Sequence, residues 1–330
     1  MSAKPASSGA TTAFLAGAAL LVAAAAPIVL GLGNYALGLL VSALVLSGLA
    51  LSWALLGNLG GMVSFGHAAF FGVGAYASAL ASARLGVPVA VAVPLGGVIA
   101  SASALTMLPT LRLSGPYFAL AILAYAQIFR ILATEATPIT GGAAGLQRYP
   151  ALPTVFGFDL STRTGSYVLV LVVLTLFVGI YVAIRRSHVG TALRAIAESE
   201  VATRVVGVDS VRLKAWMLIL SAFMAGVFGA LNAHVIGFLE PDYAFGGTWS
   251  VMPIIAAVFG GYHTVLGPIF GAVVIYLFDQ LVAKSLIPVG HEILLGLVLA
   301  AMVLVAPNGI SGLVGGVFDR IKGGRRHAAT

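Results

Sequence analysis

Long apolar blocks recur along almost the whole of this 330-residue sequence, and they limit the folds open to it. The residues are 60% hydrophobic and only 8% charged, whereas a soluble domain is about 25% charged. Each block has room for the roughly 20 residues that a helix needs to cross the hydrocarbon core of a bilayer. We therefore predict an all-α polytopic membrane protein.

The apolar blocks correspond to about ten expected transmembrane helices. Their approximate ranges are 13–32, 36–56, 61–83, 88–109, 116–134, 166–184, 214–237, 248–261, 265–283 and 290–307. The first block follows Lys4 and could be a signal peptide, but its full spanning length favours an uncleaved helix. Ten spans also divide into two five-helix halves of opposite orientation, the inverted repeat common in transporters. No pair of segments supports that repeat, so it stays a topological hypothesis.

Basic residues suggest an orientation with the N- and C-termini both in the cytoplasm. The formal net charge is +7, and this arrangement places 12 of the 17 Lys and Arg residues on the cytoplasmic side, as the positive-inside rule expects. This placement argues against nucleic acid as a partner and suits contact with anionic membrane lipid. The sequence contains no cysteine, which removes disulfide and thiolate chemistry from consideration.

Two connections between the expected helices are long. The outer loop, 135–165, is rich in Gly and Pro and is expected to be an ordered or re-entrant segment. The cytoplasmic loop, 185–213, carries apolar residues at helical spacing, which predicts one or two amphipathic helices outside the bilayer. Those residues are Val189, Leu193 and Ile196, continued by Val201, Val205 and Val208. Gly207 is placed to end the second helix.

The stretch from Gly57 to Tyr76 reads GNLGGMVSFGHAAFFGVGAY and combines small residues with one histidine. Gly60, Ser64, Ala68 and Gly72 recur every fourth residue, a spacing that flattens a helix face for close packing. Because a polar ring is costly in hydrocarbon, His67 either bonds a neighbouring helix or lines a substrate route.

His234, near Asn232, has the same two interpretations as His67. A metal site is not expected, since no carboxylate or second histidine stands at ligand spacing from His67.

The sequence lacks the motifs expected of a nucleotide hydrolase, an ion-coupled carrier or an enzyme. It holds no G-x-x-x-x-G-K-[ST] motif for nucleotide hydrolysis. The middles of the expected spans carry no carboxylate, which disfavours a proton- or sodium-coupled carrier, and no nucleophile–base set indicates an enzyme. A transporter of this kind needs a partner that supplies energy, and the loop 185–213 is either its docking surface or a solvated basic loop.

Four segments in order resemble the LivM-type permease subunits of branched-chain amino-acid ABC importers, of the LivH/LivM permease family. They cover about residues 50 to 280 and read GNLGGMVSFGHAAFFGVGAYASAL, then SGPYFALAILAYAQIFRIL followed by TGGAAGL, then SHVGTALRAIAESEVATRVVGVDSVRLKAWMLILSAFMAGVFGALNAHVIGFLEPDYAF, and VFGGYHTVLGPIFGAVV. The resemblance implies a multi-pass permease in a bacterial inner membrane, without an ATPase site or a cofactor of its own.

The resemblance also implies the partners. These are a second, LivH-like permease subunit, two cytoplasmic ATP-binding subunits and a periplasmic solute-binding protein. The family's ATPase-coupling pattern E-x-x-x-A-x-x-x-x-G fits Glu198, Ala202 and Gly207, flanked by Arg194 and Glu200.

Residues 1–330 are then expected to form a single permease domain that imports Leu-, Ile- or Val-like amino acids. The alternatives are import of urea, amides or aromatic acids on the same scaffold, a stand-alone carrier or channel, or a structural membrane protein. The expected path residues are Ser64, His67, Tyr76, Tyr117, Gln127 and Asn232, and Thr140, Gly141 and Gly142 are expected to shape the outer loop facing the binding protein.

Overall fold

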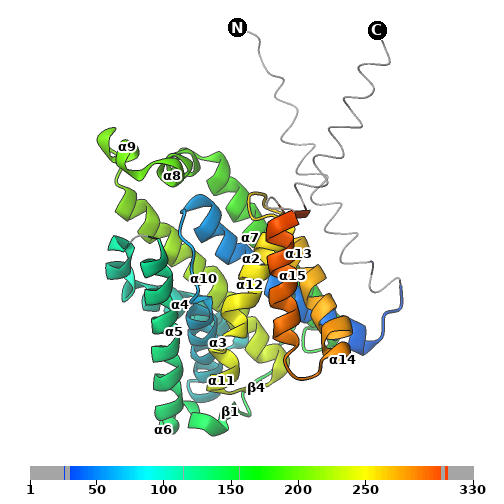
Figure 1. Ribbon diagram of the computed structural model, residues 1–330. Coiled ribbons are helices and arrows are strands. Elements are labelled where there is room, and N and C mark those ends of the chain that lie inside the picture. Colours follow the sequence, from blue (N-terminus) through cyan, green and yellow to red (C-terminus); the bar gives the residue numbers. More distant parts are fainter. Residues whose placement is uncertain (1–25, 27–29, 114, 156, 306–308, 311–330) are drawn as a thin grey trace, which may run out of the picture.

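Long helices form most of the described structure, a computed structural model that covers residues 26, 30–113, 115–155, 157–305 and 309–310 (Figure 1). Helices satisfy all their own backbone hydrogen bonds, which lipid cannot do for them. The expected first span, 13–32, lies largely outside these residues. The longer helices are α2 (Asn34–Ala54), α3 (His67–Arg84), α4 (Val89–Leu105), α5 (Pro116–Glu135), α7 (Arg163–Arg186), α8 (His188–Glu198), α10 (Ser210–Ile236), α12 (Thr248–Gly260), α13 (Gly267–Phe278) and α15 (His291–Val305).

Short elements connect these helices. They are α6 (Thr137–Thr140), α9 (Glu200–Val205), α11 (Pro241–Ala244), α14 (Lys284–Leu286), the strands β1 (Leu146–Gln147), β2 (Thr154–Val155), β3 (Phe158–Asp159) and β4 (Phe238–Leu239), the 3₁₀ turns Leu108–Arg112 and Gly142–Ala144, and the π-helical segments Leu55–Leu59 and Asp279–Ala283. The strand pairs β1–β4 and β2–β3 are antiparallel, with Leu146 opposite Leu239 and Thr154 opposite Asp159.

The chain is a multi-pass membrane protein. Among the described residues, six helical stretches are long and apolar enough to cross a bilayer, and α4 and α15 are shorter apolar helices. The six stretches are Asn34–Leu59, Pro116–Glu135, Arg163–Arg186, Ser210–Ile236, Pro241–Gly260 and Gly267–Leu286. The expected count of ten spans and the orientation stay predictions.

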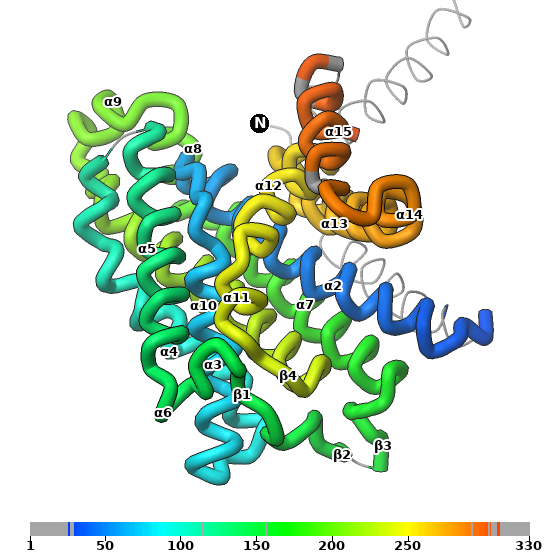
Figure 2. The backbone as a smooth tube through the Cα atoms, turned by 60° about the horizontal axis from the view of Figure 1, so that its bottom comes forward, coloured from blue at the N-terminus to red at the C-terminus, as the bar shows by residue number. Residues whose placement is uncertain are grey.

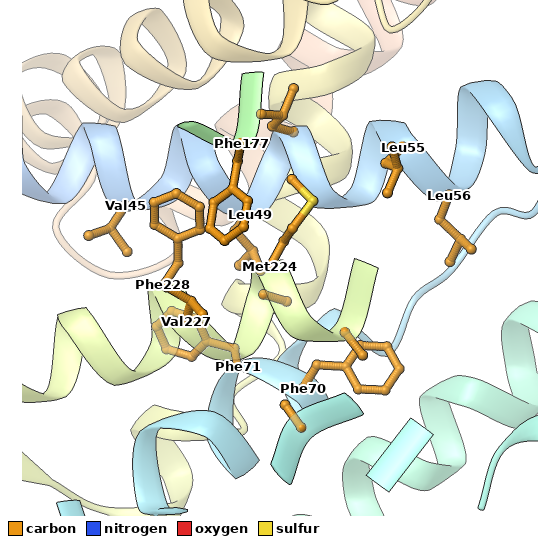
Figure 3. Packing of buried hydrophobic residues seen from close by; sticks show 14 of the residues in the cluster. Val45, Leu49, Leu55, Leu56, Phe70, Phe71, Phe177, Met224, Val227 and Phe228 are labelled. Carbon is orange, nitrogen blue, oxygen red and sulfur yellow. The ribbon is translucent and has the colours of Figure 1, made fainter. Parts of the chain in front are cut away.

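The core of the molecule surrounds α10, which packs against α2, α3 and α4. Figure 3 shows how Phe228 of α10 lies beside Phe177 of α7 and the α2 residues Val45 and Leu49. The ring centroids of Phe177 and Phe228 are 5.6 Å apart. Burial of these side chains on three helices fixes the position of α10 at the centre of the bundle.

The two ends and two flanks of the bundle carry different elements. Figure 1 places α8 and α9 at one end and α6, α11, β1 and β4 at the other. We call these the α8–α9 end and the β1–β4 end. Figures 1 and 2 both place α5 and α15 on opposite flanks.

Candidate functional site

His67 is completely buried at the first turn of α3, and both of its ring nitrogens have partners. Nδ1 lies 3.1 Å from the Ser64 hydroxyl, and Nε2 lies 3.0 Å from the Ser221 hydroxyl on α10. Ser221 donates its own proton to the Ser52 carbonyl at 2.9 Å, so its oxygen accepts from Nε2–H. The Ser64 hydroxyl then donates to Nδ1, and the ring is the neutral Nε2–H tautomer. His67 therefore links three segments of the bundle, and its place in a substrate path stays a prediction.

The expected helix over 61–83 is wrong at its beginning, because residues 60–66 form an irregular segment and α3 starts only at His67. Gly61 has a φ of +64°, a left-handed conformation that favours glycine. The Trp53 indole donates to the Ser64 carbonyl at 2.8 Å and holds the segment against α2. Gly60 and Ser64 thus do not share a helix face with Ala68 and Gly72. The prediction of a continuous face of small residues is wrong at its first two positions.

Within the helices, small residues do bring the backbones close together. A Cβ on Gly74 of α3 would collide with the carbonyl of Gly226 on α10, and one on Gly226 would collide with Ala100 of α4. Gly96 of α4 faces the Gly74 carbonyl in the same way. These contacts are the close approach that small residues permit in membrane helices, so α3, α4 and α10 form one tightly packed unit.

His234 lies near the other end of α10 and joins it to the outer loop. Its Nδ1–H donates to the Pro150 carbonyl at 2.8 Å, and its Nε2 lies 2.9 Å from the Ser78 hydroxyl. Beside it the Tyr149 hydroxyl donates to the Ala233 carbonyl at 2.9 Å, and burial raises the pKa of this phenol, which stays a donor. The segment before β2 is therefore fastened to the end of α10.

The remaining path candidates lie apart from His67. Tyr76 is buried and stacks on Phe245, and Asn232 donates to the Tyr243 hydroxyl at 2.9 Å. Gln127 is half-buried on α5 and accepts from Arg130 Nε at 3.0 Å.

Arg130 Nη1 reaches Asp242 Oδ1 on α11 at 2.8 Å. Tyr117, near the beginning of α5, is 70% exposed. The structure thus brings Ser64 and His67 together, while each of the other four candidates makes its contacts elsewhere.

The outer-loop candidates form a tight turn after α5. The Thr140 hydroxyl donates to the Ala133 carbonyl at 2.6 Å and accepts from the Gly142 backbone N–H at 3.1 Å. Gly141 and Gly142 both have positive φ, +82° and +60°. Arg84 closes the turn from α3 by donating to the Pro138 carbonyl. These contacts fix the shape of the loop at the β1–β4 end.

The expected amphipathic helices in the loop 185–213 are present as α8 and α9. Serine begins each helix, since Ser187 accepts from the Gly190 N–H and Ser199 from the Ala202 N–H. Gly207 has a φ of +86°. The Val208 N–H reaches back to the Thr203 carbonyl, the hydrogen bond that closes a helix with glycine after its end. The prediction that Gly207 ends the second helix is confirmed.

The predicted apolar stripe of this loop is only half buried. Leu193 and Ile196 are buried, but Val189 is 41%, Val201 77% and Val205 83% exposed. The valines of α9 do not continue the buried face of α8, because the extended backbone at Ser199 turns α9 away from α8. Its apolar side chains are left exposed at the end of the bundle.

Glu200 ties α9 to α10 through a compact set of polar contacts. Its Oε2 lies 2.6 Å from Lys214 Nζ, while Oε1 accepts from Arg204 Nη2 at 2.6 Å and from Ser210 Oγ at 2.8 Å. These donors, Lys214 first, hold the pKa of Glu200 at about 2, below its ordinary 4.5. Glu200 is therefore ionised at neutral pH. Arg194, Glu198, Ala202 and Gly207 are exposed around it.

A cavity of about 1,100 Å³ separates this cluster from the beginning of α5. Its walls come from the irregular segment after Gly60, from Pro116 on α5, and from Ile196, Glu200 and Lys214. Movement of α9 would change the shape of this cavity directly, since Glu200, Val201 and Arg204 of α9 line it.

Sequence reasoning missed Ser221, Ser210 and Lys214 as partners of the candidate residues. Glu200 and Lys214 are separated by the turn at Gly207, so no helical spacing relates them. Ser221 lies 154 positions after His67. Only the packing of α3 against α10 brings these two together.

Comparison with known proteins identifies the family. Residues 35–306 match the permease component of the branched-chain amino acid transport system. The high-affinity branched-chain amino acid transport system permease protein LivM of Salmonella typhimurium is 30% identical over 323 residues, covering 89% of this chain and 73% of the relative. LivM of Escherichia coli gives the same identity and coverage. LivH of Escherichia coli is 27% identical over 172 residues, covering 49% of this chain and 55% of LivH.

No solved structure matches the chain significantly. The family match extends over every described helix from α2 to α15. The chain belongs to the family of branched-chain amino acid transport permeases.

Proposed function

We propose that this chain is the permease subunit of an ATP-driven importer of branched-chain amino acids in a bacterial inner membrane. Family membership and the names of the LivM relatives support the proposal. The observation that carries it is α9, whose exposed valines Val201 and Val205 stand beside the Glu200–Lys214 ion pair. An apolar surface with charged neighbours at the end of a membrane bundle suits docking of a soluble partner.

Two ATP-binding subunits would dock on the α8–α9 end, with Arg194, Glu198, Glu200, Ala202 and Gly207 as the coupling residues. This end would then face the cytoplasm, and both termini would lie on the same side in an arrangement of ten spans with two inverted halves. Basic residues at this end support the orientation. They are Arg112, Arg185, Arg186, Arg194, Arg204, Arg212 and Lys214.

A periplasmic binding protein would deliver the solute to the β1–β4 end, where Thr140, Gly141 and Gly142 shape the outer loop. A LivH-like permease would complete the membrane part, and the whole of residues 1–330 would act as one permease domain. Closure of the ATP-binding subunits would move the loop 185–213 and swing the bundle between outward-open and inward-open states.

The substrate path would run between this chain and the second permease. Tyr117 and Gln127 lie on α5, at one flank of the bundle (Figure 2), and would face the solute directly. The buried residues Ser64, His67, Tyr76 and Asn232 would act when α3 and α10 shift against their neighbours. The chain supplies the path and the coupling, while its partners supply the energy.

Charge reversal and helix disruption in the docking loop test this proposal. Glu198→Arg places a cation on the exposed coupling surface, and Gly207→Pro cannot adopt the positive φ that ends α9. We expect both variants to insert in the membrane but to lose association with the ATP-binding subunits and ATP-driven leucine uptake. Co-purification and uptake into proteoliposomes measure the two properties separately.

A pair of valine-to-serine variants supplies the matched control. Val201→Ser with Val205→Ser removes the apolar surface of α9, whereas Val155→Ser makes the same change on the outer loop, where Val155 is 40% exposed. Only the α9 variant should weaken docking. Normal association and uptake in all the α9 and loop variants would contradict the docking surface.

Reconstitution of the purified chain alone separates an importer subunit from a stand-alone carrier. We expect no leucine flux until the second permease and the ATP-binding subunits are added. Flux through the chain by itself would contradict the proposal.

A further inference from the structure

A second cavity, of about 650 Å³, lies between α2, α12, α15 and the π-helical segment Asp279–Ala283. Its volume falls in the range of about 300–1,000 Å³ typical of small-molecule sites. Tyr243 of α11 and Lys284 of α14 also line it, and Figure 1 shows both of these helices away from the α8–α9 end. The cavity is therefore distinct from the one beneath α9.

Asp279 is a buried carboxylate in the wall of this cavity. Its side chain is only 4% exposed, and no hydrogen bond reaches its Oδ1 atom. A buried polar atom without a hydrogen bond is costly. Asp279 begins a π-helical segment, a distortion that occurs often at functional sites. The Oδ1 atom of Asp279 therefore lacks a hydrogen-bond donor among the described residues.

The neighbouring basic residues lie too far from Asp279 to donate a short hydrogen bond. Lys284 Nζ lies 3.6 Å from Asp279 Oδ2 and His291 Nε2 lies 3.5 Å from Oδ1, whereas charge-assisted hydrogen bonds are about 2.7–2.9 Å long. Lys284 is 40% exposed at the rim. Asp242, also at the rim, is already held by Arg130. The cluster thus offers an inner carboxylate and an outer cation whose ion pair is longer than a hydrogen bond.

The other walls are apolar and aromatic. Leu46, Met252 and Ile255 are buried residues that line the cavity next to Asp279. Trp249 and Tyr243 present aromatic rings to it in an edge-on pair, with centroids 5.6 Å apart. Aromatic faces attract cations, and the aliphatic wall suits a hydrocarbon chain. A ligand with both charges and an apolar chain matches this arrangement.

We propose that the cavity binds a zwitterion through its primary ammonium group, with Asp279 as the counter-ion and Lys284 as the partner of its anionic group. An ammonium carries three N–H donors and would donate to Oδ1 of Asp279, which accepts no hydrogen bond within the described residues. Two sources share this chemistry: an apolar amino acid and the headgroup of an ethanolamine phospholipid. The amino-acid source rests on the proposed function, and the lipid source is independent of it.

Two binding measurements on the full chain distinguish these sources. In nanodiscs of phosphatidylcholine alone, labelled L-leucine is titrated with 4-methylpentanoate as competitor, since this acid is leucine without its amine. In mixed nanodiscs, native mass spectrometry counts retained phosphatidylethanolamine against phosphatidylcholine, whose quaternary ammonium has no N–H donor. We expect one of the two primary ammonium ligands to be bound and its analogue to be excluded.

Substitutions locate the binding site. Asp279→Asn should weaken binding by about tenfold or more, the scale of a lost charge-assisted hydrogen bond. Asp279→Glu should retain part of the affinity. Lys284→Met, at the exposed rim, should weaken binding without disturbing the fold. Glu135→Gln, an exposed carboxylate at the end of α5, is the matched control and should bind as the natural chain does.

Binding of neither ligand would overturn the inference, as would equal competition by 4-methylpentanoate together with no preference for the ethanolamine lipid. Unchanged binding in folded Asp279→Asn or in Lys284→Met would also overturn it. The proposed function fails separately, if the assembled transporter shows no ATP-driven uptake. Normal uptake without ammonium-dependent binding would contradict the binding site and leave the proposed function intact.

Discussion

Lys214 Nζ lies 2.6 Å from Glu200 Oε2, and this ion pair joins the short helix α9 to the beginning of α10. Lys214 is largely buried, with 15% of its side chain exposed, while Glu200 is 33% exposed. Together with the hydrogen bond from Arg204 Nε to the Ser210 hydroxyl, this ion pair holds α9 to α10.

Acidification should release α9 from α10. Because the folded-state pKa of Glu200, about 2, lies below its ordinary 4.5, the ion pair is complete above about pH 4.5 and is lost as the pH falls towards 2. The sequence contains no cysteine, so Val201→Cys can carry a single spin label. Its electron paramagnetic resonance spectrum should sharpen across this window. In Glu200→Gln the spectrum should be mobile at every pH, and a pH-independent, immobile label in both proteins would contradict the role of the ion pair.

Loss of the His67 hydrogen bonds should destabilise the bundle. His67→Leu leaves the Ser64 and Ser221 hydroxyls without their ring partners, which should cost about 1–3 kcal/mol in the free energy of unfolding. His67→Asn keeps polar atoms and should cost less. Thermal unfolding measures stability, and uptake per folded molecule in the assembled transporter measures function. Uptake at the natural rate by both variants would remove His67 from the proposed path.

A single methyl group at Gly74 should disturb the packing of α3, α4 and α10. The new Cβ would collide with the Gly226 carbonyl, and overpacking of this kind costs about 1–3 kcal/mol. The control is Gly179→Ala on α7, where no atom lies within 4 Å of the new Cβ. That variant should be as stable as the natural chain or slightly more so. Equal melting temperatures for Gly74→Ala and Gly179→Ala would contradict the close approach.

The ion pair between Arg130 and Asp242 should contribute little to stability. The two side chains are 41% and 76% exposed, and pairs of this kind are worth less than about 1 kcal/mol. A double-mutant cycle with Arg130→Met and Asp242→Asn should give a coupling energy in that range, decreasing as salt is raised. A coupling energy well above it would show that the pair is shielded from solvent.

Much of the architecture could be predicted because lipid imposes a simple rule on the sequence. Apolar runs such as 116–134 and 166–184 closely match α5 and α7, since a helix is the only way to satisfy the backbone there. Gly207 could be identified as the end of α9 from the sequence, because glycine favours the positive φ that ends a helix. The family is likewise visible in four ordered segments.

The rest depends on contacts between residues far apart in the chain. The irregular segment before His67 was predicted as helix, because its small residues have a helical spacing that tertiary contacts override. The exposed valines of α9 fit the same stripe as Leu193 and Ile196, and only the turn at Ser199 separates them. Asp279 has no sequence pattern that predicts its burial, since the cavity it lines is formed by α2, α12 and α15 together.

The length of α10 has a further consequence for the two faces of the membrane. Its 27 residues extend about 40 Å, more than the roughly 30 Å hydrocarbon core, and no proline interrupts them, unlike α4 and α12. Lys214 holds one end to α9 and His234 holds the other to Pro150. We therefore expect a tilt imposed on α10 at Lys214 to displace the segment around Pro150 in the same movement.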